Sequence, residues 1–172
     1  FGYDMYSEPV RQKAMARARD TGHAALSGKV RLVQETDKDV QAGALLYVPV
    51  YRSRGGAQAD VNRGASLLGW AYSPLRMKDM MDSLLQRDHP ELAGRVAIAI
   101  HDGTTADDAS LLYDSAPGTA GAADGMRTTR RVELAGQPWT VVARSLPAFG
   151  DADIATAERA ALSASLAISL LI

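Results

Sequence analysis

Helical and extended segments follow one another in an order that leaves this chain few possible folds. Apolar residues recur at helical spacing over residues 7–22, and three extended segments come next. A second helical segment over residues 74–88 precedes four more extended segments, and a helical pattern runs from residue 151 to the end. Helices and strands do not alternate one by one, which disfavours a doubly wound parallel sheet. The order predicts an α+β fold of two tandem lobes with antiparallel sheets.

The first predicted helix carries signals at both ends. Ser7 is expected to cap it, with Glu8 and Pro9 in the first turn, where an acid and a proline are both tolerated. Gly22 is the predicted stop signal. The apolar positions at helical spacing are Val10, Ala14, Met15 and Ala18.

Three strands are predicted after that helix, at residues 29–34, 43–52 and 66–72. The second strand reads GALLYVPVYR, and Pro49 within it implies an edge position or a bulge. A polar, glycine-rich loop separates the second strand from the third. Pro74 is expected to open the second helix, whose apolar face is predicted to fill the core. That face holds Met77, Met80, Met81, Leu84 and Leu85.

The second half of the chain is predicted to begin after a break at residues 88–94. The stretch RVAIAIHDG at residues 95–103 indicates a strand that leads into a turn, and SLLYDS at 110–115 indicates another. The stretch at 128–146 reads as a hairpin around Ala135, Gly136 and Gln137.

Composition and motifs exclude several kinds of chemistry. The formal net charge is -1, so no strong field favours nucleic acid. There are no cysteines, which excludes disulfides and thiol nucleophiles. The three histidines lack the HExxH spacing of a zinc site, and no phosphate-binding loop or G-x-S-x-G motif occurs. His101 and Asp102, with Asp107 and Asp108, leave a cation site open as an alternative, although strand-to-turn transitions favour Asp and Gly anyway. No cofactor is predicted.

Four phrases carry a resemblance to a known family. They are DMYSEPVRQKAMARARDTG, ALSGKVRLVQE, GALLYVPVYR and LLGWAYSPLRMKDMM, in that order. In these phrases the chain resembles the CHASE family, the extracellular sensory domains of histidine kinases, nucleotide cyclases and diguanylate cyclases. The resemblance covers residues 2–85 and extends more weakly through VAIAIHDG and the hairpin that contains Trp139.

The resemblance implies an architecture of two PAS-like lobes held between two membrane spans. A membrane-distal, ligand-sensing lobe is expected at residues 1–90 and a membrane-proximal lobe at residues 91–150. The family's long N-terminal stalk helix and first span are expected to be missing from this chain. Residues 151–172 are expected to form a C-terminal helix that leads into the second membrane span, since residues 160–172 hold only Ala, Leu, Ile and Ser.

Plant cytokinin receptors belong to this family, and the resemblance carries their pocket onto positions of this chain. Their acidic adenine-binding residue corresponds to Arg11, their small hydroxyl residue to Ser27, and their pocket threonine to Tyr47. The acid is thus replaced by a base, which implies a ligand with a carboxylate or another anionic group if Arg11 faces the pocket. The alternative places Arg11 on the solvated side of its helix. The predicted ligand-binding residues are Arg11, Ser27, Val33, Leu45, Tyr47, Trp70 and Tyr72.

The function that the resemblance implies is ligand sensing on the periplasmic side of the bacterial inner membrane. The domain would couple a small organic ligand in the distal lobe to a cytoplasmic histidine kinase or diguanylate cyclase. The full-length receptor is expected to be a homodimer anchored by flanking spans, with no nucleic-acid partner and no enzymatic activity in this domain. The alternatives are a ligand-free dimerisation spacer and, less favoured, a small metal-dependent hydrolase that uses His101 and Asp102.

Overall fold

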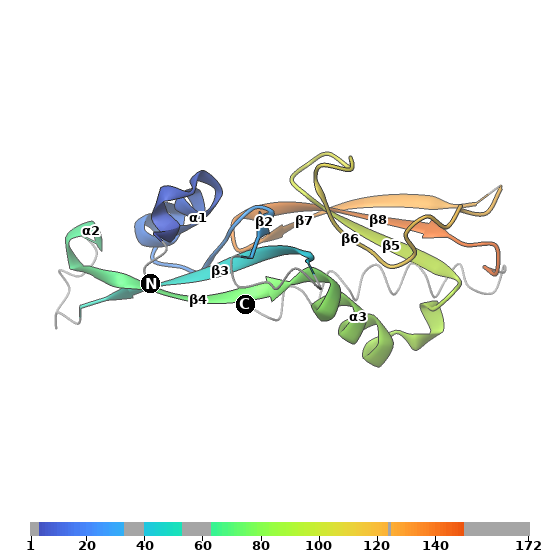
Figure 1. The fold of residues 1–172 in the computed structure, drawn as a ribbon, viewed down its shortest axis with the longest axis horizontal. Helices are drawn as coiled ribbons and strands as arrows, with labels where there is room; N and C mark the ends of the chain where they lie inside the picture. Colours follow the sequence, from blue (N-terminus) through green and yellow to red (C-terminus); the bar gives the residue numbers. More distant parts are fainter. Residues whose placement is uncertain (1–3, 33–39, 53–62, 124, 150–172) are drawn as a thin grey trace. The chain divides into compact units, whose positions relative to one another are not determined.

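The chain folds into two compact units, and its helices and antiparallel sheets confirm the predicted α+β class (Figure 1). The computed structural model describes residues 4–32, 40–52, 63–123 and 125–149. Unit 1 comprises Phe1–Leu75 and the turn Ala135–Gln137, and unit 2 comprises Arg76–Leu134 and Pro138–Ile172. The helix that follows residue 76 groups with unit 2, and the lobes expected at residues 1–90 and 91–150 stay a prediction. The predicted C-terminal helix lies outside the described residues.

Unit 1 is built on a central strand. Its elements are η1 (Met5–Ser7), α1 (Pro9–Thr21), β1 (Ala25–Leu26), β2 (Val30–Arg31), β3 (Ala42–Tyr51), α2 (Arg63–Ser66) and β4 (Leu67–Arg76). Strand β3 pairs with β1, β2 and β4. The β1 pairing joins Ala25 to Tyr47, and the β2 pairing joins Val30 to Gly43. Pro49 lies beyond the residues of β3 that β1 and β2 pair, where a missing backbone N–H costs no ladder bond to either strand.

Helix α1 begins one residue later than predicted. The side chain of Glu8, not Ser7, caps it, because the Glu8 carboxylate accepts the backbone N–H groups of Val10 and Arg11. Ser7 belongs to the preceding 3-10 turn, where its hydroxyl donates to the Asp4 carbonyl. Gly22 ends the helix in the left-handed conformation, as predicted, with φ of 76°.

The buried face of α1 also differs from the prediction. Val10 is 36% exposed, while Arg11 is buried with Ala14, Met15 and Ala18. Arg11 completes the i, i+3, i+4, i+7 stripe of one helix face, and Val10 lies off that stripe. α1 packs against β3 and is drawn above it in Figure 1. The core beneath it includes Ala25, Val30, Leu32, Leu45 and Tyr47.

Unit 2 combines one long helix with a second four-stranded sheet. Its elements are α3 (Met77–Asp88), η2 (Pro90–Leu92), β5 (Val96–Asp102), β6 (Leu111–Asp114), β7 (Arg127–Leu134) and β8 (Gln137–Ser145). Pro74 does not open the helix as predicted, because β4 continues through it and α3 starts at Met77. Met77, Met81 and Leu84 are buried, which confirms the predicted core role of this apolar face.

The sheet of unit 2 has the strand order β6-β5-β8-β7. β5 pairs with β8 from Val96–Ser145 to Asp102–Trp139, and Trp139 is completely buried. The predicted hairpin is confirmed, although its turn is tighter and Gln137 already belongs to β8. Ala135 and Gly136 both have positive φ, as the two central residues of a tight hairpin turn require.

No helix among residues 4–32, 40–52, 63–123 and 125–149 is long and apolar enough to cross a membrane. The segment predicted to begin a span lies outside these ranges.

Candidate functional site

Six of the seven predicted ligand-binding residues are described, and all six lie in unit 1. Arg11 lies on α1, Ser27 directly follows β1, and the other four lie on β3 and β4. Leu45 and Tyr47 are two positions apart on β3, and so are Trp70 and Tyr72 on β4, so each pair shares a face of its strand. Val33 lies outside the described residues.

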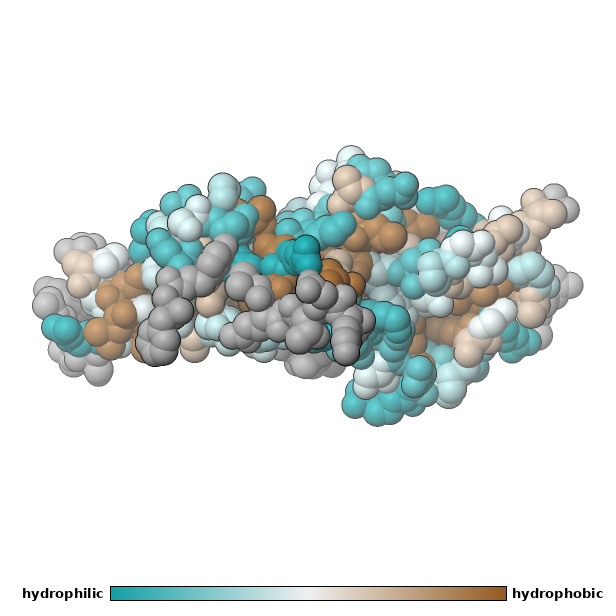
Figure 2. All heavy atoms as spheres, in the orientation of Figure 1, coloured by the Kyte–Doolittle hydropathy of each residue, from teal (hydrophilic) through white to brown (hydrophobic). Residues whose placement is uncertain are grey.

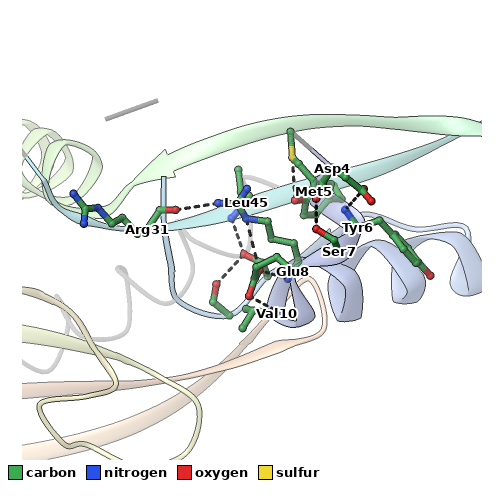
Figure 3. Close-up of polar contacts among 12 residues, drawn as sticks. Asp4, Met5, Tyr6, Ser7, Glu8, Val10, Arg31 and Leu45 are labelled. Atoms are coloured by element: carbon green, nitrogen blue, oxygen red, sulfur yellow. Dashed lines mark hydrogen bonds and ion pairs between the residues drawn. The ribbon is translucent and has the colours of Figure 1, made fainter. Parts of the chain in front are cut away.

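The Arg11 side chain is 4% exposed, so the alternative that placed it on the solvated side of the helix is wrong. Its Nη2 donates to the Arg31 carbonyl oxygen at 2.9 Å, which ties α1 to β2. Its Nε lies 3.7 Å from Oε2 of Glu8, the same carboxylate that caps the helix. Figure 3 shows Glu8, Val10 and Arg31 in this network. The guanidinium thus joins a helix start to a strand and brings a permanent positive charge into unit 1.

Ser27 is 1% exposed and its hydroxyl is engaged on both sides. Its Oγ accepts the Leu45 backbone N–H at 2.9 Å and donates to the Gly28 carbonyl at 2.8 Å. The Ser27 backbone N–H also donates to the Leu45 carbonyl at 2.8 Å. The hydroxyl therefore replaces a backbone partner where the strand pairing shifts between β1 and β2. A ligand would reach Ser27 only by replacing one of these bonds.

An aromatic cluster occupies the face of β3 and β4 that holds the predicted wall residues. Tyr47 is 1% exposed, and its ring centroid lies 6.1 Å from that of Tyr72, which is 45% exposed. Trp70 donates from Nε1 to the Met15 carbonyl at 2.9 Å, and its ring stacks at 5.8 Å on Tyr6. The cluster therefore runs from a buried phenol to a half-exposed one, and aromatic faces of this kind bind flat apolar ligands well.

Sequence reasoning missed the contribution of the segment before α1. Met5 and Tyr6 pack against the core of unit 1, and the Tyr47 hydroxyl lies 3.6 Å from Sδ of Met5. Asp4 accepts the Tyr6 backbone N–H at 2.9 Å, which fixes this short turn (Figure 3). The aromatic residues ahead of the first helix were the available signal, because a large ring beside a helix start is often a packing contact.

His101, the residue of the alternative hydrolase hypothesis, contacts the loop between β5 and β6. It is 8% exposed, and its Nδ1 lies 3.0 Å from the Asp107 carbonyl oxygen and 3.3 Å from Ser110 Oγ. The Asp107 carboxyl accepts hydrogen bonds from Ser110, and these lower its pKa. The bond from the Ser110 backbone N–H has the larger effect. Within the part of the chain that the structure describes, no three His, Asp or Glu side chains gather in a way that could hold a metal ion.

The arrangement in unit 1 is suited to binding. Its polar groups, Arg11 and Ser27, are engaged by backbone carbonyl and amide groups, and no nucleophile with an adjacent base is found among the described residues of this cluster. The apolar and aromatic side chains around them supply contact area.

Comparison with known proteins agrees with this description. A family model, described as the CHASE domain, matches residues 1–113, which spans unit 1 up to Leu75 and continues into unit 2 as far as β6. No curated protein matches the chain. The matched part is well over half of the 172 residues. CHASE domains are extracellular sensory modules of signalling receptors and are not catalytic. The chain belongs to the CHASE domain family.

Proposed function

We propose that this domain senses a small organic ligand on the periplasmic side of the inner membrane and passes the signal to a cytoplasmic histidine kinase or diguanylate cyclase. Membership of the CHASE family supports the sensory role. The two units are proposed to be PAS-like lobes, of which unit 1 would be the membrane-distal one. The full-length receptor is proposed to be a homodimer anchored by spans that flank the domain.

The single observation that carries the proposed site is the pairing of Tyr72 with Tyr47. A half-exposed ring contacts a fully buried one at 6.1 Å, so aromatic surface of unit 1 remains open beside a closed core. A ligand ring that covers Tyr72 would bury apolar area without opening that core. We therefore propose that the ligand lies against Tyr72, with Trp70, Leu45 and Tyr47 behind it.

Arg11 bears on the charge of the proposed ligand. Its guanidinium is buried and permanently charged, which favours a carboxylate or another anionic group. The Glu8 carboxylate 3.7 Å away offsets part of this charge. We therefore expect an acid to bind more tightly than its neutral amide, by a modest factor of about five to ten.

The site is tested by titrating a library of small aromatic acids and their amides into the purified domain, with thermal stabilisation as the first readout and calorimetry as the second. Tyr72→Ala is expected to weaken the best ligand by tenfold or more. Val48→Ala is the matched control, because Val48 is also 45% exposed but alternates to the opposite face of β3 from Tyr47. Equal losses in both variants would contradict the proposed site.

The charge preference is tested separately. Arg11→Met keeps the length of the side chain and removes its charge, and it is expected to abolish the preference for an acid over its amide. Variants are compared only after circular dichroism shows that they are folded. An unchanged acid preference in folded Arg11→Met protein would show that Arg11 does not act on the ligand.

A further inference from the structure

A cavity of about 690 Å³ lies within unit 2. Its walls come from the last turns of α3, from η2, from β5 and β6, and from residues 146–148. None of the residues that line it is one of the predicted ligand-binding residues. Its size lies within the range of small-molecule sites in proteins, which is about 300–1,000 Å³.

Most of the cavity wall is apolar. The side chains come from four separate segments, so the cavity is a product of tertiary packing; the main ones are Leu85, Leu92, Val96, Ile98, Leu146 and Pro147. In Figure 2, apolar side chains show between polar ones near β5, whereas the visible surface of α3 is mainly polar. Such walls favour a ligand with a mainly apolar body.

A hydrogen-bonded pair, Tyr113 and Asp82, lies among the polar residues of the wall, which also include Gln86, His89, Ser115 and Thr119. The Tyr113 hydroxyl donates to Asp82 Oδ1 at 2.7 Å, and the Lys78 ammonium group donates to Asp82 Oδ2. The hydrogen bond from Lys78, and to a smaller extent that from Tyr113, lowers the pKa of the Asp82 carboxyl. Asp82 is therefore ionised at neutral pH. Burial raises the pKa of Tyr113, so its hydroxyl remains a donor. Asp82 thus presents a fixed carboxylate at the cavity.

The charged side chain in the cavity lining disfavours anions. Among the described residues that line it there is no Lys or Arg, and Asp82 is the one carboxylate. Its partner Lys78 is 64% exposed, so the compensating charge is in solvent and not in the wall. His89, also in the wall, has its Nδ1 3.3 Å from Oε1 of Glu91. A ligand carboxylate would meet Asp82 with no cation in the lining to balance it.

We propose that this cavity is a second ligand site of the domain and binds a small, mainly apolar molecule that directs an amine or a hydroxyl group at Asp82. An ionised carboxylate accepts hydrogen bonds and cannot donate them, so the ligand must supply the proton. An ammonium group gains charge attraction in addition to the hydrogen bond. The site goes beyond the sensing function proposed for unit 1 and does not depend on it.

Three indole probes of the same apolar body test the site by calorimetry on the full chain. They are tryptamine, tryptophol and indole-3-acetate, which end in a cation, a neutral hydroxyl and an anion. Tryptamine is expected to bind tightest, tryptophol several-fold more weakly, and indole-3-acetate at least tenfold more weakly than tryptamine. Indole-3-acetate as the tightest probe, or no binding of tryptamine and tryptophol at millimolar concentration, would overturn the proposal.

Two pairs of variants locate the binding. Ala116→Leu extends a side chain of the lining and is expected to weaken tryptamine at least tenfold, while Ala106→Leu, in an exposed loop outside the lining, should leave it unchanged. Asp82→Asn removes the charge and should bring tryptamine and tryptophol to equal affinity. Asp79→Asn is its control, because Asp79 lies on the same helix but not in the lining.

The outcome also separates this site from the one in unit 1. Tyr72→Ala should leave tryptamine affinity unchanged, because Tyr72 does not line the cavity. If Tyr72→Ala abolishes tryptamine binding while Ala116→Leu does not, the probe occupies unit 1 and the second site is refuted. If Ala116→Leu alone abolishes it, the second site stands whatever becomes of the first.

Discussion

Units 1 and 2 each contain a four-stranded antiparallel sheet and a helix of similar length. The two helices differ in the side chains on their buried faces. The buried face of α1 has Ala14, Met15 and Ala18 beside a buried arginine whose hydrogen bond reaches β2. The buried face of α3 carries the long side chains Met77, Met81 and Leu84. Two of the four buried positions of α1 are alanines, whereas all the buried positions of α3 carry long side chains, and a cavity lies at the C-terminal end of α3.

This contrast teaches where each unit can accept a ligand. In unit 1 the described core residues are buried, and aromatic surface remains exposed on Tyr72. In unit 2 a cavity is bounded by α3, β5, β6 and the segments that follow α3 and β8. A ligand of unit 1 would cover an existing surface, and a ligand of unit 2 would fill a cavity.

The largest expected effect is the loss of stability when a buried core leucine of unit 1 is truncated. The matched truncation is of a leucine in the cavity wall of unit 2. Leu45→Ala should lower the free energy of unfolding by about 3 kcal/mol, because Leu45 is 3% exposed in the core cluster of unit 1. Leu85→Ala should cost about 1 kcal/mol, since Leu85 is half-buried and already borders open space. Urea unfolding of both variants measures the difference. Equal losses of stability would contradict the proposed difference in packing between the core of unit 1 and the cavity wall of unit 2.

The next effect concerns the buried arginine of α1. Arg11→Met should destabilise the protein by about 2 kcal/mol, because the Arg31 carbonyl loses its charged donor and Glu8 loses a nearby cation. Arg87→Met on α3 is the matched change in unit 2 and should cost far less stability than Arg11→Met, since that side chain is 74% exposed. Thermal unfolding compares the two. A loss at Arg87 as large as at Arg11 would show that burial of the arginine does not matter.

A third prediction concerns two turn glycines with nearly the same backbone. Gly136 has φ of 76° and Gly118 has φ of 72°, so alanine is strained at either position by about 1 kcal/mol. A Cβ at Gly136 would also lie 2.7 Å from Arg17 Cδ, whereas nothing lies within 4 Å at Gly118. Moving Arg17 disturbs its hydrogen bond to the Gly136 carbonyl, so Gly136→Ala should cost more. Urea unfolding midpoints that are the same for both variants would argue against this contact.

The smallest effect is a pH dependence carried by Asp82 in unit 2. Lys78 and Tyr113 lower its pKa in the folded protein, so ionised Asp82 stabilises the fold above the pKa of the unfolded chain, near 4. This contribution, less than about 1 kcal/mol, is lost as the pH falls through the lower folded pKa. Asp82→Asn should therefore be less stable than wild type at pH 7 and nearly equal to it at pH 2, by urea unfolding. A difference that grows as the pH falls would contradict this assignment.

Local patterns predicted the elements well, and tertiary contacts decided the rest. The alternation in GALLYVPVYR and VAIAIHDG and the turn at Ala135 and Gly136 produced β3, β5 and the β7–β8 hairpin as expected. Pro74 was expected to open a helix, but β4, which pairs with β3, stays extended to Arg76. Arg11 was not predicted in the core, because its acceptor lies twenty residues away on Arg31.

The candidate sites were predictable to different degrees. Resemblance to the family placed six described residues in unit 1, and the structure locates four of them on the faces that form the aromatic cluster. The part played by Tyr6 could not be read from a strand or helix period, since it precedes both. The unit 2 cavity had no linear signal at all, because its wall is assembled from segments between residues 82 and 148.

Hydrogen exchange measured by mass spectrometry, with and without the tightest ligand found in the library, tests the central claim most directly. The claim is that the sensed ligand lies against Tyr72 on unit 1. It predicts slower exchange in peptides from α1, β3 and β4, with peptides from β5 to β8 unchanged. Protection confined to α3, β5 and β6 would contradict it, and would place ligand sensing in the cavity of unit 2.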